Sequence, residues 1–146
     1  MKDLGLKKRF VTKVAISSCG NFGVAGFNDG YLAKVSMQSG SHMKTFYNTI
    51  AHQGKEIVGI LIDSTNHSMV TADQNTVVLW DFFSGIYQQK VELSSDISML
   101  VPDANSSIFG VVTHNEISLM ELHSLRQVRT FIGHKGVIND CKLSIT

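Results

Sequence analysis

Cysteine and proline are both scarce in this chain, and each shortage limits the kinds of site and structure that the chain can form. Cys19 and Cys141 are the two cysteines among 146 residues, and neither belongs to a CxxC pair or to a Cys/His spacing that binds zinc. We therefore predict two small, buried or half-buried thiols in a reducing compartment. The single proline, Pro102, ends an apolar run, where the missing N–H of a strand end is tolerated.

Charge and long apolar runs are also limited. Charged residues make up 17% of the chain and the net charge is +1, which gives no overall electrostatic case for binding nucleic acid or an acidic substrate. The basic cluster at residues 7–9 is typical of a solvated segment. The longest purely aliphatic run, residues 60–62, is far too short to span a bilayer, and charges near Met1 interrupt any secretory signal. We therefore expect a soluble, intracellular protein.

Helical periodicity is missing, and short strand-like runs take its place. No stretch keeps apolar residues at positions i, i+3, i+4 and i+7. Short runs rich in Val, Ile, Phe and Thr alternate with Gly, Asn, Ser and Asp turns, as in β-strands joined by tight turns. The sequence therefore predicts an all-β fold.

These runs recur as an internal repeat. Each copy opens on a similar apolar spacing, and the openings at residues 11, 57, 97 and 138 lie 46, 40 and 41 residues apart. That period matches the ~40–45 residues of a four-stranded propeller blade. We expect blade-like repeats at about 11–46, 57–93 and 97–131, with an incomplete one at 138–146, in a single unit covering residues 1–146.

Two dipeptide motifs point to a known repeat. Gly133-His134, Ala51-His52 and the later Trp80-Asp81 resemble the WD40 repeat family. That resemblance implies a β-propeller, in which a His, a Ser or Thr, an Asp and a Trp form a buried hydrogen-bonded chain within a blade. The expected architecture is a partial WD40 β-propeller with about three four-stranded blades plus the first strand of a fourth.

The family's buried chain is matched unevenly. In the second copy, His52, Thr71 and Trp80 match, but Gln74 stands in the Asp place and Asp73 comes one residue early, so the chain is expected to be incomplete. The other copies depart further: Asp29 stands in the Asp place of the first copy with Val35 for Trp, and the third copy has His114 and Met120.

Longer segments carry a narrower resemblance. The runs KKRFVTKVAISSCGNFGVAGFNDG, VSMQSGSHMKTF, AHQGKEIVGILID and RTFIGHKGVINDCKLS are similar to a propeller family of the U3 small nucleolar RNA-associated UTP-B subcomplex, in the small-subunit processome. This resemblance covers residues 11–144. It implies a non-enzymatic scaffold in the nucleolus that acts in 18S pre-rRNA processing. Its partners would be UTP-B-like subunits of the pre-ribosomal particle, with direct RNA contact left open.

Catalytic, metal and cofactor sites are not predicted. Asp63, Asp73 and Asp81 are spread along one copy, where Asp serves turns by local backbone hydrogen bonds. The six histidines form no HxH or HExxH motif, and the glycines around Cys19 precede no helix that would complete a phosphate-binding loop. Cys19 itself is interpreted as a turn residue.

Exposed loops between the second and third strands of each copy are the predicted interaction sites. An exposed aromatic there, such as Tyr31 beside Phe27, would suit a protein contact. The alternative function is a WD40 recognition module for a peptide or modified tail in signalling or chromatin, although converging carboxylates are few. The predicted loop residues are Asn28, Asp29, Tyr31, Gln74, Asn75, His114 and Asn115.

Three repeats do not complete a ring, because closed WD40 propellers commonly have about seven blades. An open arc leaves sheet faces and edges uncovered. Two explanations stay open: the chain is a piece of a longer one, or several copies assemble to close a ring.

Overall fold

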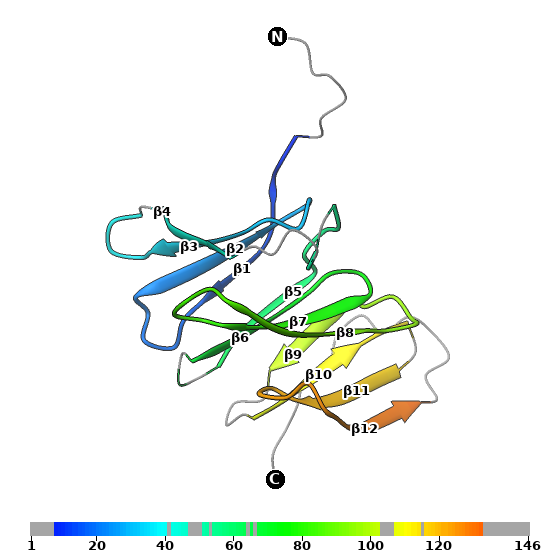
Figure 1. The fold of residues 1–146 in the computed structure, drawn as a ribbon. Helices are drawn as coiled ribbons and strands as arrows, with labels where there is room; N and C mark the ends of the chain where they lie inside the picture. The colour runs from blue at the N-terminus through cyan, green and yellow to red at the C-terminus, as the bar shows by residue number, and fades with distance from the viewer. Residues whose placement is uncertain are drawn as a thin grey trace.

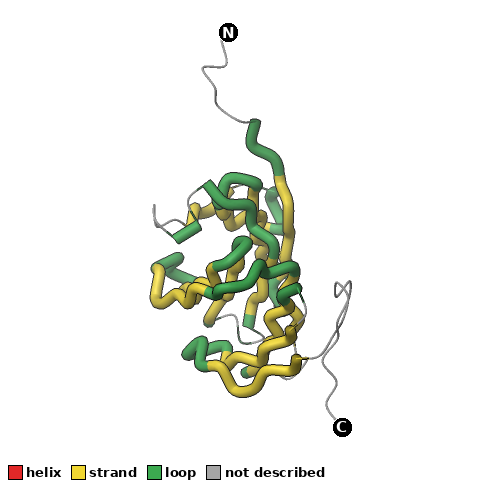
Figure 2. Tube along the Cα trace, turned by 90° about the vertical axis from the view of Figure 1, so that its right-hand side faces the viewer, coloured by secondary structure: helices red, strands yellow, loops and turns green. Residues whose placement is uncertain are grey.

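The computed structural model describes residues 8–40, 42–46, 51–52, 54–63, 65, 67–102, 107–114 and 116–132. Within these ranges the chain forms strands and turns without helix, as Figure 2 shows, so the predicted all-β class is confirmed. The strands are β1 (Val11–Ile16), β2 (Phe22–Phe27), β3 (Leu32–Ser36), β4 (His42–Phe46), β5 (Gly59–Ile62), β6 (Ser68–Ala72), β7 (Thr76–Asp81), β8 (Tyr87–Glu92), β9 (Met99–Pro102), β10 (Ile108–Val112), β11 (Glu116–Glu121) and β12 (Gln127–Ile132).

Each set of four consecutive strands forms one antiparallel sheet, in the orders β1-β2-β3-β4, β5-β6-β7-β8 and β12-β11-β10-β9. We call these sheets blade 1, blade 2 and blade 3. The blades follow one another in chain order (Figure 1), and β5 contacts both β1 and β9, so the first strands form a row. This is an arc of a propeller, as predicted. The expected fourth opening strand at 138–146 lies outside the described residues, as do His134 and Cys141.

The strand registers make the blades equivalent position by position. Val35, Trp80 and Met120 each pair with the second residue of the preceding strand. The turn after the third strand also repeats. Gly40, Gly85 and Leu125 donate their N–H to the carbonyl four residues earlier and have φ of 70°, 72° and 56°. Leu125 therefore adopts a left-handed conformation that favours glycine, and its buried side chain offsets that cost.

The core consists of layers between neighbouring blades. Between blades 1 and 2 it contains Val24, Leu32, Ile57, Met69 and Trp80. Between blades 2 and 3 it contains Val70, Val77, Leu79, Phe109 and Met120, together with further apolar residues. Strand β7 is buried on both faces, as the continuous apolar run in VVLWDF predicts.

Cys19 departs from the predicted burial. It is exposed, in a turn that Gly20 closes by donating its N–H to the Ser17 carbonyl over 2.9 Å. Hydrogen bonds from the Ser17 side chain and the Asn21 backbone lower the pKa of the thiol. The turn prediction is confirmed and the buried-thiol prediction is wrong for Cys19, which lies in the exposed turn between β1 and β2. None of the described segments is a helix with the length and apolarity that a membrane crossing requires.

Candidate protein-interaction face

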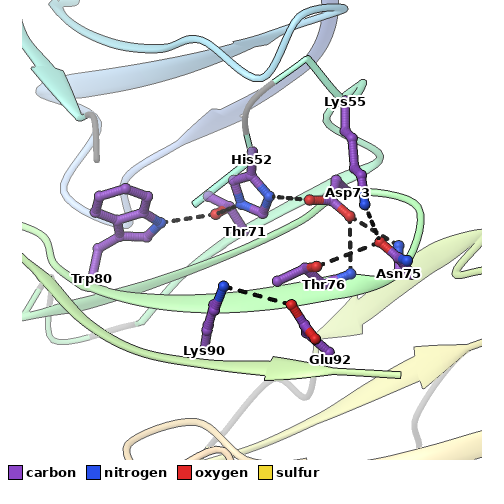
Figure 3. Close-up of polar contacts among 9 residues, drawn as sticks. All are labelled: His52, Lys55, Thr71, Asp73, Asn75, Thr76, Trp80, Lys90 and Glu92. Carbon is purple, nitrogen blue, oxygen red and sulfur yellow. Dashed lines mark hydrogen bonds and ion pairs between the residues drawn. The ribbon is translucent and has the colours of Figure 1, made fainter. Parts of the chain in front are cut away.

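A buried hydrogen-bonded chain runs along β6 and β7 of blade 2, from Trp80 to Asp73 in the β6–β7 turn (Figure 3). Trp80 Nε1 on β7 lies 2.8 Å from Thr71 Oγ1 on β6, and that oxygen lies 2.7 Å from His52 Nε2. His52 Nδ1 lies 2.7 Å from Asp73 Oδ2. Every donor meets one acceptor if Trp80 donates to Thr71, Thr71 to His52 and His52 Nδ1–H to Asp73. The network thus assigns the tautomer of His52.

The Asp73 carboxylate also holds the loop that follows it. Its Oδ1 accepts the backbone N–H groups of Asn75 and Thr76, each at 2.9 Å. Burial alone would raise the pKa of Asp73, but the hydrogen bonds from His52 and from these backbone donors outweigh it, and the pKa lies below its ordinary value. The carboxylate is therefore ionised and fully partnered at neutral pH.

Gln74 does not occupy the Asp position of the buried hydrogen-bonded network, which corrects the assignment made from the sequence. Gln74 is exposed and donates through Nε2 to Asp96 Oδ2 over 3.0 Å, whereas Asp73 completes the chain that was expected to be incomplete. Residues two apart along a strand point to the same face, so Thr71 and Asp73 share a side and Gln74 points away. That period-2 rule is the signal that could have identified Asp73.

The other two blades replace this chain rather than repeat it. In blade 3 the places of Thr71 and Trp80 are taken by Val111 and Met120, which are buried in the apolar core. His114 is exposed. In blade 1, Val35 stands at the Trp place, as the sequence shows, and Asp29 is 36% exposed and paired with a different residue.

The residue that pairs with Asp29 is Arg9, in the segment that precedes β1. Arg9 Nε donates to Asp29 Oδ2 over 2.8 Å, and its guanidinium lies 4.2 Å from the centroid of the Tyr31 ring. Asn28 Oδ1 accepts a hydrogen bond from the Phe10 N–H over 2.8 Å, and Asn28 Nδ2 donates to the Lys8 carbonyl over 3.1 Å. Three predicted interaction residues, Asn28, Asp29 and Tyr31, are therefore half-buried and already bind the chain's own entering segment.

A polar groove of about 530 Å³ lies beside this loop, between the ends of blades 1, 2 and 3. Lys55 Nζ donates to Asn75 Oδ1 over 2.9 Å at its edge, and Glu56 is exposed. The groove brings together residues from the β2–β3 loop, the β6–β7 loop and the segments before β5 and β9. Its lining includes Asn28, Lys55, Glu56, Gln74, Asp96 and Ile97.

Asp81, the acidic half of the Trp-Asp pair, has a local role. Its Oδ1 accepts the N–H of Ser84 over 2.9 Å, and this bond is the main reason that its pKa is lowered. Asn115 and His134, also singled out in the sequence, lie outside the described residues.

A Ser-His-Asp contact between blades 2 and 3 was not foreseen from the residue pattern. His123 Nδ1 lies 3.3 Å from Ser68 Oγ, and His123 Nε2 lies 3.8 Å from Asp63 Oδ2. The Ser68 hydroxyl belongs to a residue only 8% exposed, which does not suit attack on a substrate. In the part of the chain that the structure describes, His, Cys, Asp and Glu form no group of three that could hold a metal.

Comparison with known families agrees with the geometry. The model of the WDR36/Utp21 second β-propeller domain matches residues 2–146. The chain belongs to this family. Its assignment confirms both the WD40-type propeller and the resemblance to the U3-associated proteins.

Curated relatives cover nearly all of the chain. WD repeat-containing protein 36 of Homo sapiens is 34% identical over 148 residues, which is 99% of this chain and 16% of that protein. U3 small nucleolar RNA-associated protein 21 of Saccharomyces cerevisiae is 30% identical over 132 residues, and its homolog in Schizosaccharomyces pombe is 28% identical over 138. These two alignments cover 88% and 93% of the chain, and 14% and 15% of the relatives. The chain thus spans about a sixth or less of these relatives.

Solved structures share the fold at low identity. U3-55K superposes with a TM-score of 0.81 and the RRP9 WD40 repeats with 0.80, each at 14% identity over 92% of this chain and 42% of theirs. The Cps50 (Swd1) β-propeller domain of Myceliophteria thermophila gives 0.70 at 16% identity, over 87% of this chain and 40% of that one. At these identities the likeness shows the fold alone.

Proposed function

We propose that this chain is a non-enzymatic scaffold segment that holds protein partners in ribosome biogenesis, within a U3-associated particle that processes the 18S rRNA precursor. The observation that carries the proposal is the family membership over residues 2–146, together with relatives named for association with U3 small nucleolar RNA. The proposed location is the nucleolus, and UTP-B-like subunits are the proposed partners.

The groove supports a protein partner more than RNA. Its exposed charged lining residues are Lys55, Glu56 and Asp96, so acidic groups outnumber basic ones there. A nucleic-acid face is expected to carry a basic stripe for the phosphates. The alternative role as a reader of modified tails is not favoured, because the aromatic ring of the first loop, Tyr31, is already covered by Arg9.

Co-purification tests the proposal. The tagged full natural protein is expected to recover U3 RNA and processome proteins from nuclear extract. Reversing the groove charge with Glu56→Arg and Asp96→Arg should reduce recovery of a direct protein partner several-fold at unchanged protein level. The matched control is Glu92→Arg, an exposed acid on the outer strand of blade 2. Wild-type protein that recovers neither U3 RNA nor these proteins would contradict the proposal.

We also propose that blades 1 and 3 pack against further blades of a closed ring, from the same chain or from another copy. On blade 1, Val14 and Ile16 are 66% and 58% exposed, although the corresponding Ile60 and Ile62 face an interblade core in blade 2 or border it. On blade 3, Phe131 is 45% exposed. Such apolar faces normally need a neighbouring repeat.

The 146-residue segment expressed alone should therefore self-associate in size-exclusion chromatography. Val14→Asn with Ile16→Asn should shift it towards monomer, whereas Lys13→Asn, a polar change on the same strand, should not. A compact, well-behaved wild-type monomer would contradict ring closure through these faces.

A further inference from the structure

Lys34 is a buried lysine at the boundary between blades 1 and 2. It lies on β3 and is 4% exposed. Its ammonium donates to the Phe82 carbonyl over 3.2 Å, and three phenyl rings surround it. The centroid distances are 4.2 Å to Phe82, 4.7 Å to Phe22 and 5.5 Å to Phe83.

This socket makes burial of the charge tolerable. An ammonium group removed from water is costly unless acceptors replace its hydration. A carbonyl oxygen and the negative faces of aromatic rings supply that replacement, and cation–π contacts strengthen when they are desolvated. The turn after β7 provides the carbonyl and two of the rings, so the socket belongs mainly to blade 2.

The equivalent place between blades 2 and 3 has different chemistry. By strand register, Leu79 takes the place of Lys34 and Ser68 that of Phe22. After β11 come Leu122 and His123, in the places of Phe82 and Phe83. Leu79 and Leu122 belong to the apolar core, and Ser68 lies 3.3 Å from His123.

We propose that these two sets of side chains are a pairing code that selects which blade packs on which. The face of blade 1 is matched to the turn of blade 2. Against the turn of blade 3, Lys34 would keep Phe22 of its own blade but would meet Leu122 and His123 in place of the two phenyl rings, Phe82 and Phe83, that help to compensate its buried charge. Discrimination of this kind comes from the penalty on the wrong pair. The inference concerns assembly of the ring and is independent of the proposed role in ribosome biogenesis.

Transplanting the socket into the boundary between blades 2 and 3 of the full natural protein tests whether the aromatic rings are sufficient to accept a buried lysine. Leu79→Lys places an ammonium in the unmatched boundary and should lower the folding equilibrium constant by about 100-fold or more. Adding Leu122→Phe and His123→Phe should recover at least about 10-fold of that loss. The same two Phe substitutions without Lys at position 79 should give no gain. Failure of the aromatic pair to rescue Leu79→Lys would overturn the code.

A double-mutant cycle provides the second readout, with variants that keep the fold. Phe83 is 54% exposed, so Phe83→Leu is mild, and Lys34→Met keeps most of the side-chain volume. We expect non-additivity of about 2- to 5-fold in the unfolding equilibrium constant. Additive effects would overturn the proposal, because the ring would then not contribute to recognition of the ammonium.

Discussion

Asp73→Ala should lower the free energy of unfolding by about 3–5 kcal/mol, because it removes a carboxylate that accepts three hydrogen bonds and a buried donor left without its acceptor costs about 1–3 kcal/mol. The carboxylate accepts from His52 and from the backbone of Asn75 and Thr76, and the residue is fully buried. Its loss leaves three donors without their acceptor, two of them buried and the Asn75 N–H partly buried, and removes the anchor of the His52-Thr71-Trp80 chain. Chemical denaturation of the propeller, followed by Trp80 fluorescence, measures the change.

The neighbouring Gln74→Ala is the matched control. Its side chain is exposed and bonded to Asp96 on the surface, so the expected change lies within about 0.5 kcal/mol. Equal effects of the two substitutions would show that Asp73 is not the residue that completes the buried chain.

The pH dependence should identify the same carboxylate. Because its folded pKa lies below the unfolded value of about 3.9, its stabilisation is complete above that value and is lost as pH falls through the folded pKa. Stability of the wild type should therefore drop below about pH 4, and Asp73→Asn should show a shallower drop. Denaturation at pH 7, 5, 4 and 3 measures both profiles, and parallel profiles would contradict this role.

Gly30→Ala should cost about 3–5 kcal/mol, from left-handed strain and steric overlap together. Gly30 has φ of +91°, and a Cβ there would lie 2.1 Å from the His52 backbone oxygen. That oxygen accepts the Lys55 N–H over 2.9 Å, so relieving the overlap displaces the loop that presents His52 to the buried chain.

Gly20→Ala and Gly40→Ala separate the two contributions. Both glycines have positive φ, 77° and 70°, and an added Cβ would meet nothing within 4 Å. Their expected cost is the conformational one alone, about 1–2 kcal/mol. Thermal unfolding of the three variants should place Gly30→Ala well below the others, and similar melting temperatures for all three would contradict the clash.

Much of the fold could be predicted from the residues because its determinants are local. Strand-length apolar runs, turn residues and a period of about 40 residues specify a four-stranded repeat, and each observed sheet is a meander of consecutive strands. The resemblance to the WD40 repeat, rather than local spacing, implied that His52, Thr71 and Trp80 belong to a buried chain. It missed Asp73 because a single residue of loop length moved the acid out of the expected spacing.

Contacts between blades could not be predicted from local sequence patterns. The apolar run around Lys34 predicts a buried strand, but it does not show what receives the ammonium, because the socket residue Phe82 lies 48 positions later. Likewise, the β2–β3 loop looked free for a partner, yet Arg9 reaches it from 20 residues upstream.

The amino-acid pattern was thus sufficient for the strands, the repeat and the family, since hydrogen-bonding geometry and burial repeat at short range. Three properties depended on folding instead: the carboxylate that completes the buried chain, the loop that is already occupied, and the way in which one blade selects the next. These properties arise where distant side chains meet in a space from which water is excluded, and the strength of a charge or hydrogen bond there is set by the neighbours that packing supplies.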